Sequence, residues 1–164
     1  MLTVGAFHGG LRENIIPDSV WMIGTIRTLD EGMRKLIHER ITRTVQGIAQ
    51  SGGATADVTI TRGYDITRND TLLTDKMWPT LRRVAGAKMV SAGLPSPAGE
   101  DFSIFARKAP GLFIFLGVTP PALDWHTAAV NHSPIFQADD RAMPIGVRLM
   151  AGMAIDYMRL NRVQ

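Results

Sequence analysis

The sequence contains no cysteine among its 164 residues. Disulfide bonds, thiolate metal ligands and a thiol nucleophile are therefore excluded within this chain. It also lacks any apolar run close to the roughly 20 residues that a membrane-spanning helix requires. The first residues alternate like a strand and show neither the basic nor the apolar region of a signal peptide. We therefore expect a cytoplasmic protein with no membrane partner.

A concentrated positive charge is missing as well. The formal net charge is only +3, from 18 lysines and arginines against 15 acidic residues, and the basic residues are spread along the chain. A nucleic-acid-binding protein would need a basic face, so nucleic acid is the least favoured class of partner. With 45% hydrophobic and 20% charged residues, the composition is that of a globular protein with one ordinary domain or two small ones.

Residues 1–65 predict part of a small α+β domain. Residues 2–7 and 19–29 alternate as two strands, which we expect to pair as a hairpin with a long connection. A helix follows, with Asp30 suited to its N-cap and Gly52-Gly53 to its end. Its charged residues, Arg34 among them, are most simply interpreted as a solvated face. Residues 56–60 alternate again and predict a third strand. This order of elements is most of a sandwich in which helices cover one sheet.

A change in composition and a new helix-capping signal near residue 66 predict a domain boundary there. Asp70 should cap a further helix, in which Pro79 predicts a kink or a break. The apolar residues 112–116 predict a central strand that is covered on both faces. A closing helix should begin near Asp139-Asp140. The stripe of that helix expected to face the core consists of Met143, Val147, Met150, Ala154 and Tyr157.

His132 lies in residues 117–138, a stretch that is long for a connection without regular structure. Such loops are often functional. A neutral imidazole in a loop beyond a strand is a common metal ligand. The simpler alternative is a loop histidine that forms ordinary hydrogen bonds. No other ligand is adjacent in the sequence, so the residues alone leave both interpretations open.

Arg27 and Glu100 are two further candidates. Arg27 shares a strand face with Trp21 and Ile23, and the alternative to a binding role is an arginine that extends its charged head into solvent. Glu100 and Asp101 precede a predicted short helix, for which capping and solvation are the simplest interpretation.

Five short motifs follow one another along the chain. They are Asn14-Ile15-Ile16-Pro17-Asp18, Gly24-Thr25-Ile26-Arg27-Thr28, Gly99-Glu100-Asp101-Phe102-Ser103, Pro110-Gly111 with Phe115-Leu116-Gly117, and Asn131-His132-Ser133-Pro134 ahead of Asp139-Asp140. In this order the chain resembles the C-terminal half of the metal-dependent amidohydrolase and aminoacylase family. That family includes hippurate hydrolase, the auxin-conjugate amidohydrolases and, more distantly, carboxypeptidase-type relatives. The resemblance extends from about Leu2 to Tyr157.

The resemblance implies an α/β fold with two parts. Residues 1–65 would form part of a small α+β, ferredoxin-like lid and dimerisation domain. Residues 66–164 would form the C-terminal portion of a zinc-peptidase-like catalytic domain. The boundary inferred from capping and composition agrees with this division.

The resemblance also implies roles for four residues. His132 would be the last metal ligand, and Asn14 and Arg27 would contact the carboxylate of the substrate. Arginine offers a carboxylate a bidentate fork, and asparagine offers an amide donor. Glu100 would lie in a loop that approaches the substrate. The other metal ligands and the glutamate general base of the family lie in its N-terminal half, so no catalytic residue is expected in this chain.

We therefore predict a fragment or truncated member of a metal-dependent amidohydrolase that hydrolyses N-acyl amino acids or related amides with metal-activated water. A divalent zinc, manganese or cobalt ion is implied in the complete enzyme, with an incomplete site and no activity in this chain alone. The alternatives are a non-catalytic dimerisation or binding module and the C-terminal half of a split enzyme. The expected partners are a carboxylate-bearing amide and either a second copy or a missing N-terminal half.

Overall fold

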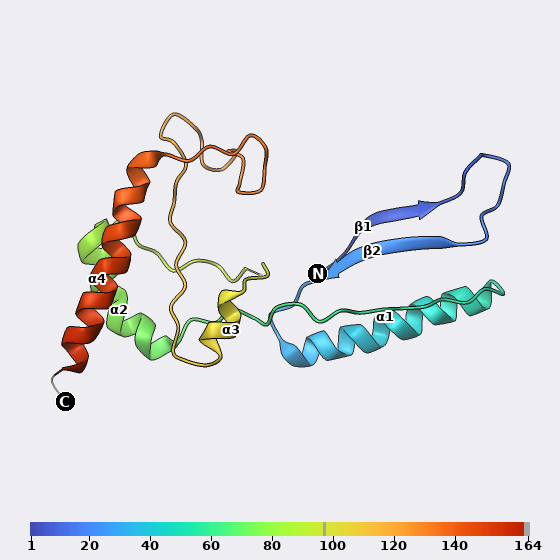
Figure 1. The fold of residues 1–164 in the computed structure, drawn as a ribbon, viewed down its shortest axis with the longest axis horizontal. Coiled ribbons are helices and arrows are strands. Elements are labelled where there is room, and N and C mark those ends of the chain that lie inside the picture. The colour runs from blue at the N-terminus through green and yellow to red at the C-terminus, as the bar shows by residue number, and fades with distance from the viewer. Residues whose placement is uncertain (97, 163–164) are drawn as a thin grey trace. The chain divides into compact units, whose positions relative to one another are not determined.

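The computed structural model describes residues 1–96 and 98–162 of the chain, which divide into two compact units (Figure 1). Unit 1 comprises Met1–Thr67 with Leu94–Ile104, and unit 2 comprises Arg68–Gly93 with Phe105–Gln164. The break after Thr67 lies next to the boundary predicted near residue 66, but residues 94–104 join the first unit. The assignment of these parts to a lid and a catalytic domain stays a prediction.

Unit 1 begins with an antiparallel hairpin of β1 (Leu2–Gly9) and β2 (Val20–Ile26). The register pairs His8 with Trp21, and their rings stack with centroids 4.2 Å apart. An irregularity between Val4 and Ala6 shifts the register by one residue. The predicted hairpin with its long connection is confirmed.

Helix α1 (Glu31–Ser51) begins and ends where the sequence predicts. The side chain of Asp30 accepts a hydrogen bond of 2.6 Å from the backbone N–H of Met33, which satisfies a donor that the first turn leaves unpaired. At the other end Gly53 adopts a left-handed φ of 71°, a conformation that costs glycine little because it has no Cβ.

Two predicted strands are absent from the described residues. Residues 56–60 and 112–116 carry no strand assignment, although Ala56, Val58 and Ile60 are half-buried and the residues between them are exposed, as the alternation predicts. Figure 1 shows the chain returning from α1 without joining β1 or β2. The strand predictions are wrong for this chain because a ladder needs a neighbouring strand as well as an alternating sequence.

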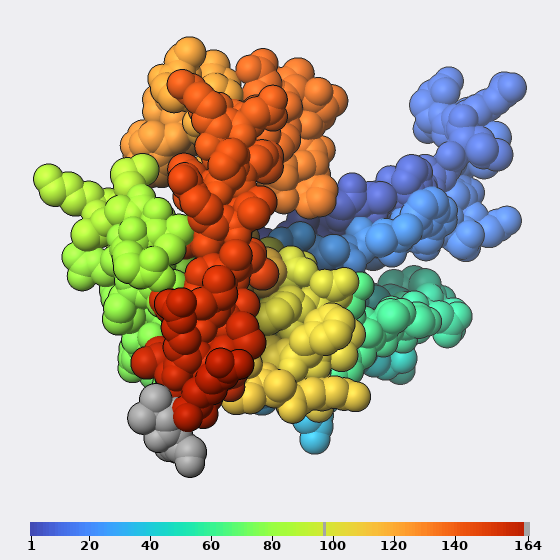
Figure 2. Space-filling model, turned by 60° about the vertical axis from the view of Figure 1, so that its left-hand side comes forward, coloured from blue at the N-terminus to red at the C-terminus, as the bar shows by residue number. Residues whose placement is uncertain are grey.

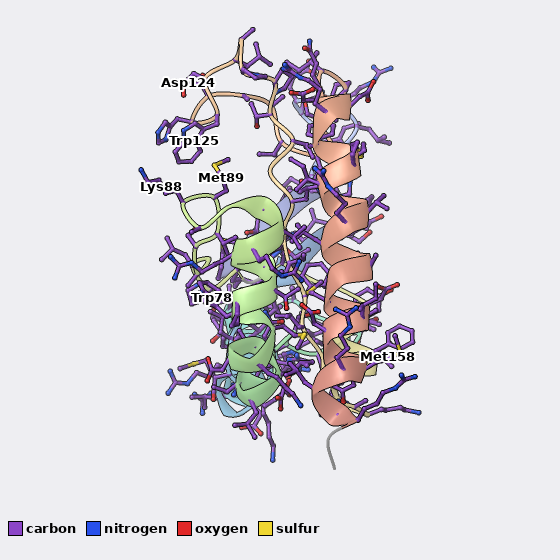
Figure 3. All side chains as sticks on the ribbon, turned by 90° about the vertical axis from the view of Figure 1, so that its left-hand side faces the viewer. Trp78, Lys88, Met89, Asp124, Trp125 and Met158 are labelled. Atoms are coloured by element: carbon purple, nitrogen blue, oxygen red, sulfur yellow. The ribbon has the colours of Figure 1, made fainter. Side chains whose placement is uncertain are left out.

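Unit 2 is built on α2 (Thr71–Ala85) and α4 (Met143–Asn161), which lie side by side (Figure 3). The short helix α3 (Phe102–Ala106) and the 3-10 turn η1 (Asp140–Ala142) complete the regular structure of the described residues. Pro79 lies inside α2, and the predicted break does not occur. Met77 and Leu81 are buried on both sides of this proline, and their packing stabilises the helix where a backbone hydrogen bond is lost.

The face of α4 that packs against α2 is not the predicted stripe. The stripe residues from Met143 to Tyr157 are all exposed, and Figure 2 shows α4 at the surface along its length. The inner face instead carries the buried Leu149 and, beside it, Gly152. A Cβ added to Gly152 would lie 3.3 Å from Val84 Cγ2, so the two helices approach closely at this glycine. The stripe prediction is wrong because several sides of α4 are apolar, and packing against α2 decides which of them is buried.

None of the helices in the described residues combines the length and the apolarity that a membrane span requires.

Candidate functional site

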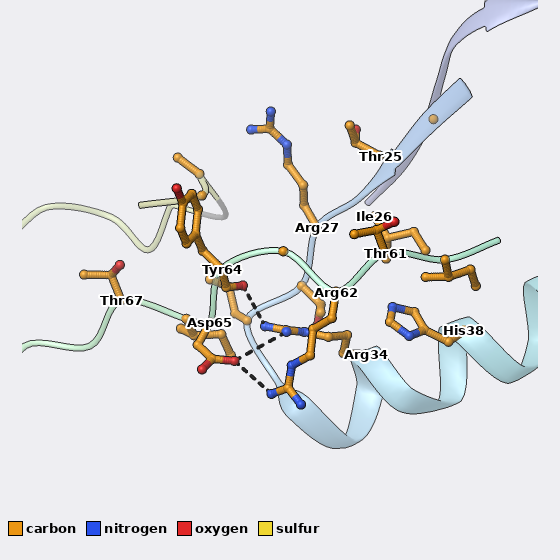
Figure 4. Close-up of a pocket in the computed structure, with 18 of the residues that line it drawn as sticks. Thr25, Ile26, Arg27, Arg34, His38, Thr61, Arg62, Tyr64, Asp65 and Thr67 are labelled. Atoms are coloured by element: carbon orange, nitrogen blue, oxygen red, sulfur yellow. Dashed lines mark hydrogen bonds and ion pairs between the residues drawn. The ribbon is translucent and has the colours of Figure 1, made fainter. Parts of the chain in front are cut away.

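Unit 1 contains a pocket of about 580 Å³ (Figure 4). Its lining comes from residues 22–29 at the end of β2, from two side chains of α1, and from residues 59–67, which return along α1. Ser96, Ala98 and Gly99 complete the wall. Three arginines line this pocket, and their ion pairs distinguish them.

Arg34 and Arg62 are neutralised by acids of the same unit. Arg34 lies 2.8 Å from Glu31 and 3.6 Å from Asp65, and only 11% of its side chain is exposed. Arg62 donates a hydrogen bond of 2.9 Å to Asp65 and lies 3.4 Å from Glu31. That hydrogen bond and the charges of both acids raise the pKa of Arg62 above its ordinary value. These four residues form what we name the ion cluster, which joins the start of α1 to the returning segment.

Arg27 is the third arginine, and its side chain has no ion pair or hydrogen bond within the part of the chain that the structure describes. Its backbone N–H donates a 2.9 Å hydrogen bond to the carbonyl of Met1, which holds the end of β2 in place. In Figure 4 the side chain extends away from the ion cluster. Because the other two cations are already paired, Arg27 is the guanidinium that remains able to bind an external carboxylate.

Asn14 and Glu100 are not part of this pocket lining. Asn14 is exposed in the connection between the strands, whereas Arg27 follows the opposite end of β2. Seven strand residues separate those ends, a span of roughly 20 Å. Within one copy of the chain, the structure therefore does not bring Asn14 to Arg27. Glu100 is half-buried and directly follows the lining residue Gly99.

His132 belongs to unit 2 and is exposed. Its φ is 72°, which makes it the one non-glycine residue with a positive φ among the described residues. Hydrogen bonds from Ser133 N to Val130 O and from Phe136 N to Ser133 O hold this turn at 3.2 and 3.1 Å. A residue whose backbone is held in a sparsely populated conformation supports a hypothesis of function.

The residues present do not fit a complete metal centre. No group of three or more histidine, aspartate or glutamate side chains that could hold a metal occurs within the described parts of the chain. A catalytic zinc site needs about three protein ligands, and His132 would supply one.

The ion cluster was missed at the level of the sequence. Arg34 was assigned there to a solvated helix face, but the structure buries most of its side chain. One signal was available, since Glu31 with Arg34 and Arg62 with Asp65 are both oppositely charged pairs at a spacing of three. Nothing in the sequence indicated that the two pairs, about thirty residues apart, would meet.

Comparison with known proteins supports the resemblance to the amidohydrolase family. No family model matches the chain. It is 30% identical over 160 residues to the putative amidohydrolase YhaA of Bacillus subtilis, 34% identical over 158 residues to thermostable carboxypeptidase 2 of Saccharolobus solfataricus, and 30% identical over 158 residues to N-acetyldiaminopimelate deacetylase of Streptococcus sanguinis. These alignments cover 96–98% of this chain but only 39–40% of the relatives. The chain thus spans about two fifths of the length of the relatives it matches.

A solved structure supports the fold. The YXEP protein of Bacillus subtilis, described as a dinuclear metal-binding peptidase of the M20 family, matches 94% of this chain and 41% of its own with a TM-score of 0.69 and 26% sequence identity. The α/β fold class expected from the resemblance is confirmed by this match. Together with the aligned amidohydrolase, deacetylase and carboxypeptidase, it identifies the protein as a homologue of the M20 amidohydrolases and peptidases.

Proposed function

We propose that this chain supplies the substrate carboxylate site of a metal-dependent amidohydrolase that acts on N-acyl amino acids or related amides. The observation that carries the proposal is Arg27, a pocket arginine without an ion pair among the described residues, beside two arginines that have one. A free guanidinium at a pocket wall suits a carboxylate, because it can donate two parallel hydrogen bonds. The hydrolase names of the relatives support the class of reaction.

The remaining site residues take the roles that the resemblance implies. Glu100 would approach the substrate from the loop beside the pocket. Asn14 would contact a substrate carboxylate from a second copy of the chain, because one copy does not bring it to Arg27. His132 would contribute one ligand to a divalent metal ion. When bound in the complete protein, such an ion of the zinc, manganese or cobalt type would supply activated water for attack on the amide carbonyl.

We further propose that residues 1–65 act as part of the lid and 66–164 as the C-terminal portion of the catalytic domain. Because His132 has no partner ligands within the described residues, the chain alone should be inactive. Activity would need residues equivalent to the N-terminal half of the family, either on the same polypeptide or on a separate one. Robust metal-dependent hydrolysis of an N-acyl amino acid by the purified 164-residue chain, without a supplied N-terminal half, would contradict this point.

Ligand titration followed by NMR tests the carboxylate site. N-acetyl-L-phenylalanine should shift backbone signals around Arg27, whereas its carboxamide analogue, which lacks the charge, should not. Arg27→Ala should abolish the shifts, and Arg27→Lys should restore binding only in part, because lysine lacks the planar fork. Arg40→Ala, an exposed position on α1 outside the pocket lining, is the matched control. Equal binding by Arg27→Ala and the unchanged chain would refute the site.

A second candidate, a non-catalytic dimerisation module, is favoured by the hairpin. Its sheet has two strands in the described residues, so each strand has an unpaired edge. Large apolar side chains on it, including Phe7 and Ile23, are more than half exposed. Unpaired edges and exposed apolar side chains are typical of a protein interface. A clean monomer in sedimentation equilibrium at high concentration would count against this candidate.

A further inference from the structure

Tyr64 contributes an aromatic side chain to the wall of the pocket that holds Arg27. It is 54% exposed, and its ring makes no aromatic or cation contact within the described parts of the chain. Figure 4 shows the side chains of Tyr64 and Arg27 extending to the same side of the returning segment. The wall therefore offers an accessible aromatic ring together with a free guanidinium.

The backbone at Tyr64 is held firmly although its ring is free. Arg34 donates a 3.2 Å hydrogen bond to the carbonyl of Tyr64. The next residue, Asp65, accepts the 2.9 Å hydrogen bond of Arg62 and has only 16% of its side chain exposed. The ion cluster therefore holds the carbonyl of Tyr64 and the carboxylate of Asp65 close to the start of α1. The ring therefore extends from a backbone position that is restrained.

Gly99 lies at one edge of the ring. A Cβ added to Gly99 would lie 3.7 Å from Tyr64 Cδ2, so the loop contacts the ring edge without a side chain of its own. Ile26, Ile60 and Ile66 also line the pocket. The wall thus combines the free guanidinium of Arg27 with an aromatic ring and aliphatic side chains.

We propose that Tyr64 is a specificity-determining residue of this pocket, and that Arg34 is the positioning residue that holds it. This inference rests on the proposed carboxylate site at Arg27. The ring packs against the group carried next to the carboxylate of the ligand, and it favours ligands in which that group is aromatic or large and apolar. A restrained tyrosine suits this task, because its ring offers a large contact area with few rotamers to order on binding.

The test compares two probes on the full chain. The dissociation constants of N-acetylglycine and N-acetyl-L-phenylalanine are measured by NMR titration, and their ratio reports the preference for the aromatic group. In the unchanged chain, N-acetyl-L-phenylalanine should bind about five- to tenfold more tightly, as expected for an aromatic pair that also buries apolar area. Tyr64→Ala should remove this preference, and Tyr64→Phe, which keeps the ring, should retain it.

Arg34 requires a readout that a purely structural role would not change. Arg34→Ala should reduce the preference about as much as Tyr64→Ala, while the affinity for N-acetylglycine changes less than about twofold, because Arg27 is untouched. Arg34→Lys should restore part of the preference, since lysine can donate to one carbonyl. Arg83→Ala, which breaks an ion pair in unit 2, is the control for general destabilisation. Equal weakening of both probes by Arg34→Ala would assign Arg34 a merely structural role.

The outcomes separate the two proposals. If Arg27→Ala abolishes binding of both probes but Tyr64→Ala leaves their ratio unchanged, the Tyr64 inference is overturned and the carboxylate site stands. If neither probe binds the unchanged chain, or both bind Arg27→Ala normally, the carboxylate site itself is refuted and the Tyr64 inference falls with it.

Discussion

Units 1 and 2 hold their elements together by different interactions. In unit 2, α2 and α4 share a buried apolar contact that includes Met77, Leu81 and Leu149. In unit 1, α1 has no buried residue, and the start of the helix is tied to the returning segment by the ion cluster. Apolar burial depends little on salt or pH, whereas ion pairs near the surface depend on both. The two units should therefore respond differently to core mutation and to salt.

Truncation of the unit 2 core should have the largest effect. Leu81→Ala should lower the free energy of unfolding by about 2–5 kcal/mol, because it removes buried methyl groups and leaves a cavity. Urea unfolding followed by the fluorescence of Trp78, which lies on α2 (Figure 3), measures it. Leu72→Ala on the same helix is the control, because Leu72 is 81% exposed. Similar losses in the two variants would show that α2 and α4 do not form a common core.

Adding a larger side chain at the contact between α2 and α4 should have the next largest effect. Gly152→Val should cost about 1–3 kcal/mol of unfolding free energy, since even a Cβ at this position would lie 3.3 Å from Val84. Gly47→Ala on α1 is the opposite case, because a Cβ there would meet nothing within 4 Å. That change should be neutral or stabilising by up to about 1 kcal/mol. Thermal unfolding of both variants provides the comparison, and a stable Gly152→Val would contradict the close helix approach.

Acid should weaken unit 2 at its polar helix contact. Hydrogen bonds from Thr80 and then Arg83 lower the pKa of Asp156 below its ordinary value of 3.8. A lowered folded-state pKa contributes stability that is present above pH 3.8 and is lost as the pH falls through the lowered value. Asp156→Asn should remove this part of the pH dependence. Melting temperatures measured across that range, with Asp75→Asn on the exposed face of α2 as control, should show the flatter profile only for Asp156→Asn.

Salt should produce the smallest effect, and it should act on unit 1. Raising the ionic strength from about 0.05 M to about 1 M shortens the screening length severalfold and weakens the ion cluster. Backbone amides in the first turn of α1 and at residues 62–65 should then exchange hydrogen roughly two- to threefold faster. The amides of α2 around Met77 should change less. Equal acceleration in both places would indicate that unit 1 does not depend on its ion pairs.

Local signals in the sequence predicted most of the elements correctly. Asp30 and Asp70 accept the capping hydrogen bonds expected of them, from Met33 N and Leu73 N. A capping motif contains its own hydrogen-bond partner a few residues along the chain, so the sequence is sufficient to locate it. The five motifs likewise identified the family, because the type and order of residues can be recognised in the sequence without knowing how they pack.

Features that depend on distant neighbours were predicted less well. At residues 112–116 the side chain of Asn69 takes the place of a neighbouring strand: its NH2 donates to the C=O of Phe113, and its Oδ1 accepts from the N–H of Phe113. The packed face of α4 was also misjudged, since several sides of that helix are apolar and only its partner decides which one is buried. Arg34 was assigned to solvent for the same reason.

The sequence by itself determined the caps, the helices, the hairpin and the motifs that relate this chain to the M20 amidohydrolases and peptidases. Each of these depends on residues close together in the chain or on their order. Only the tertiary structure decided which arginine of the pocket is free, because Arg34 and Arg62 are neutralised by acids that the fold brings together. Charge is assigned by the sequence, but the availability of a charge for a ligand is set by what lies within about 4 Å of it in space.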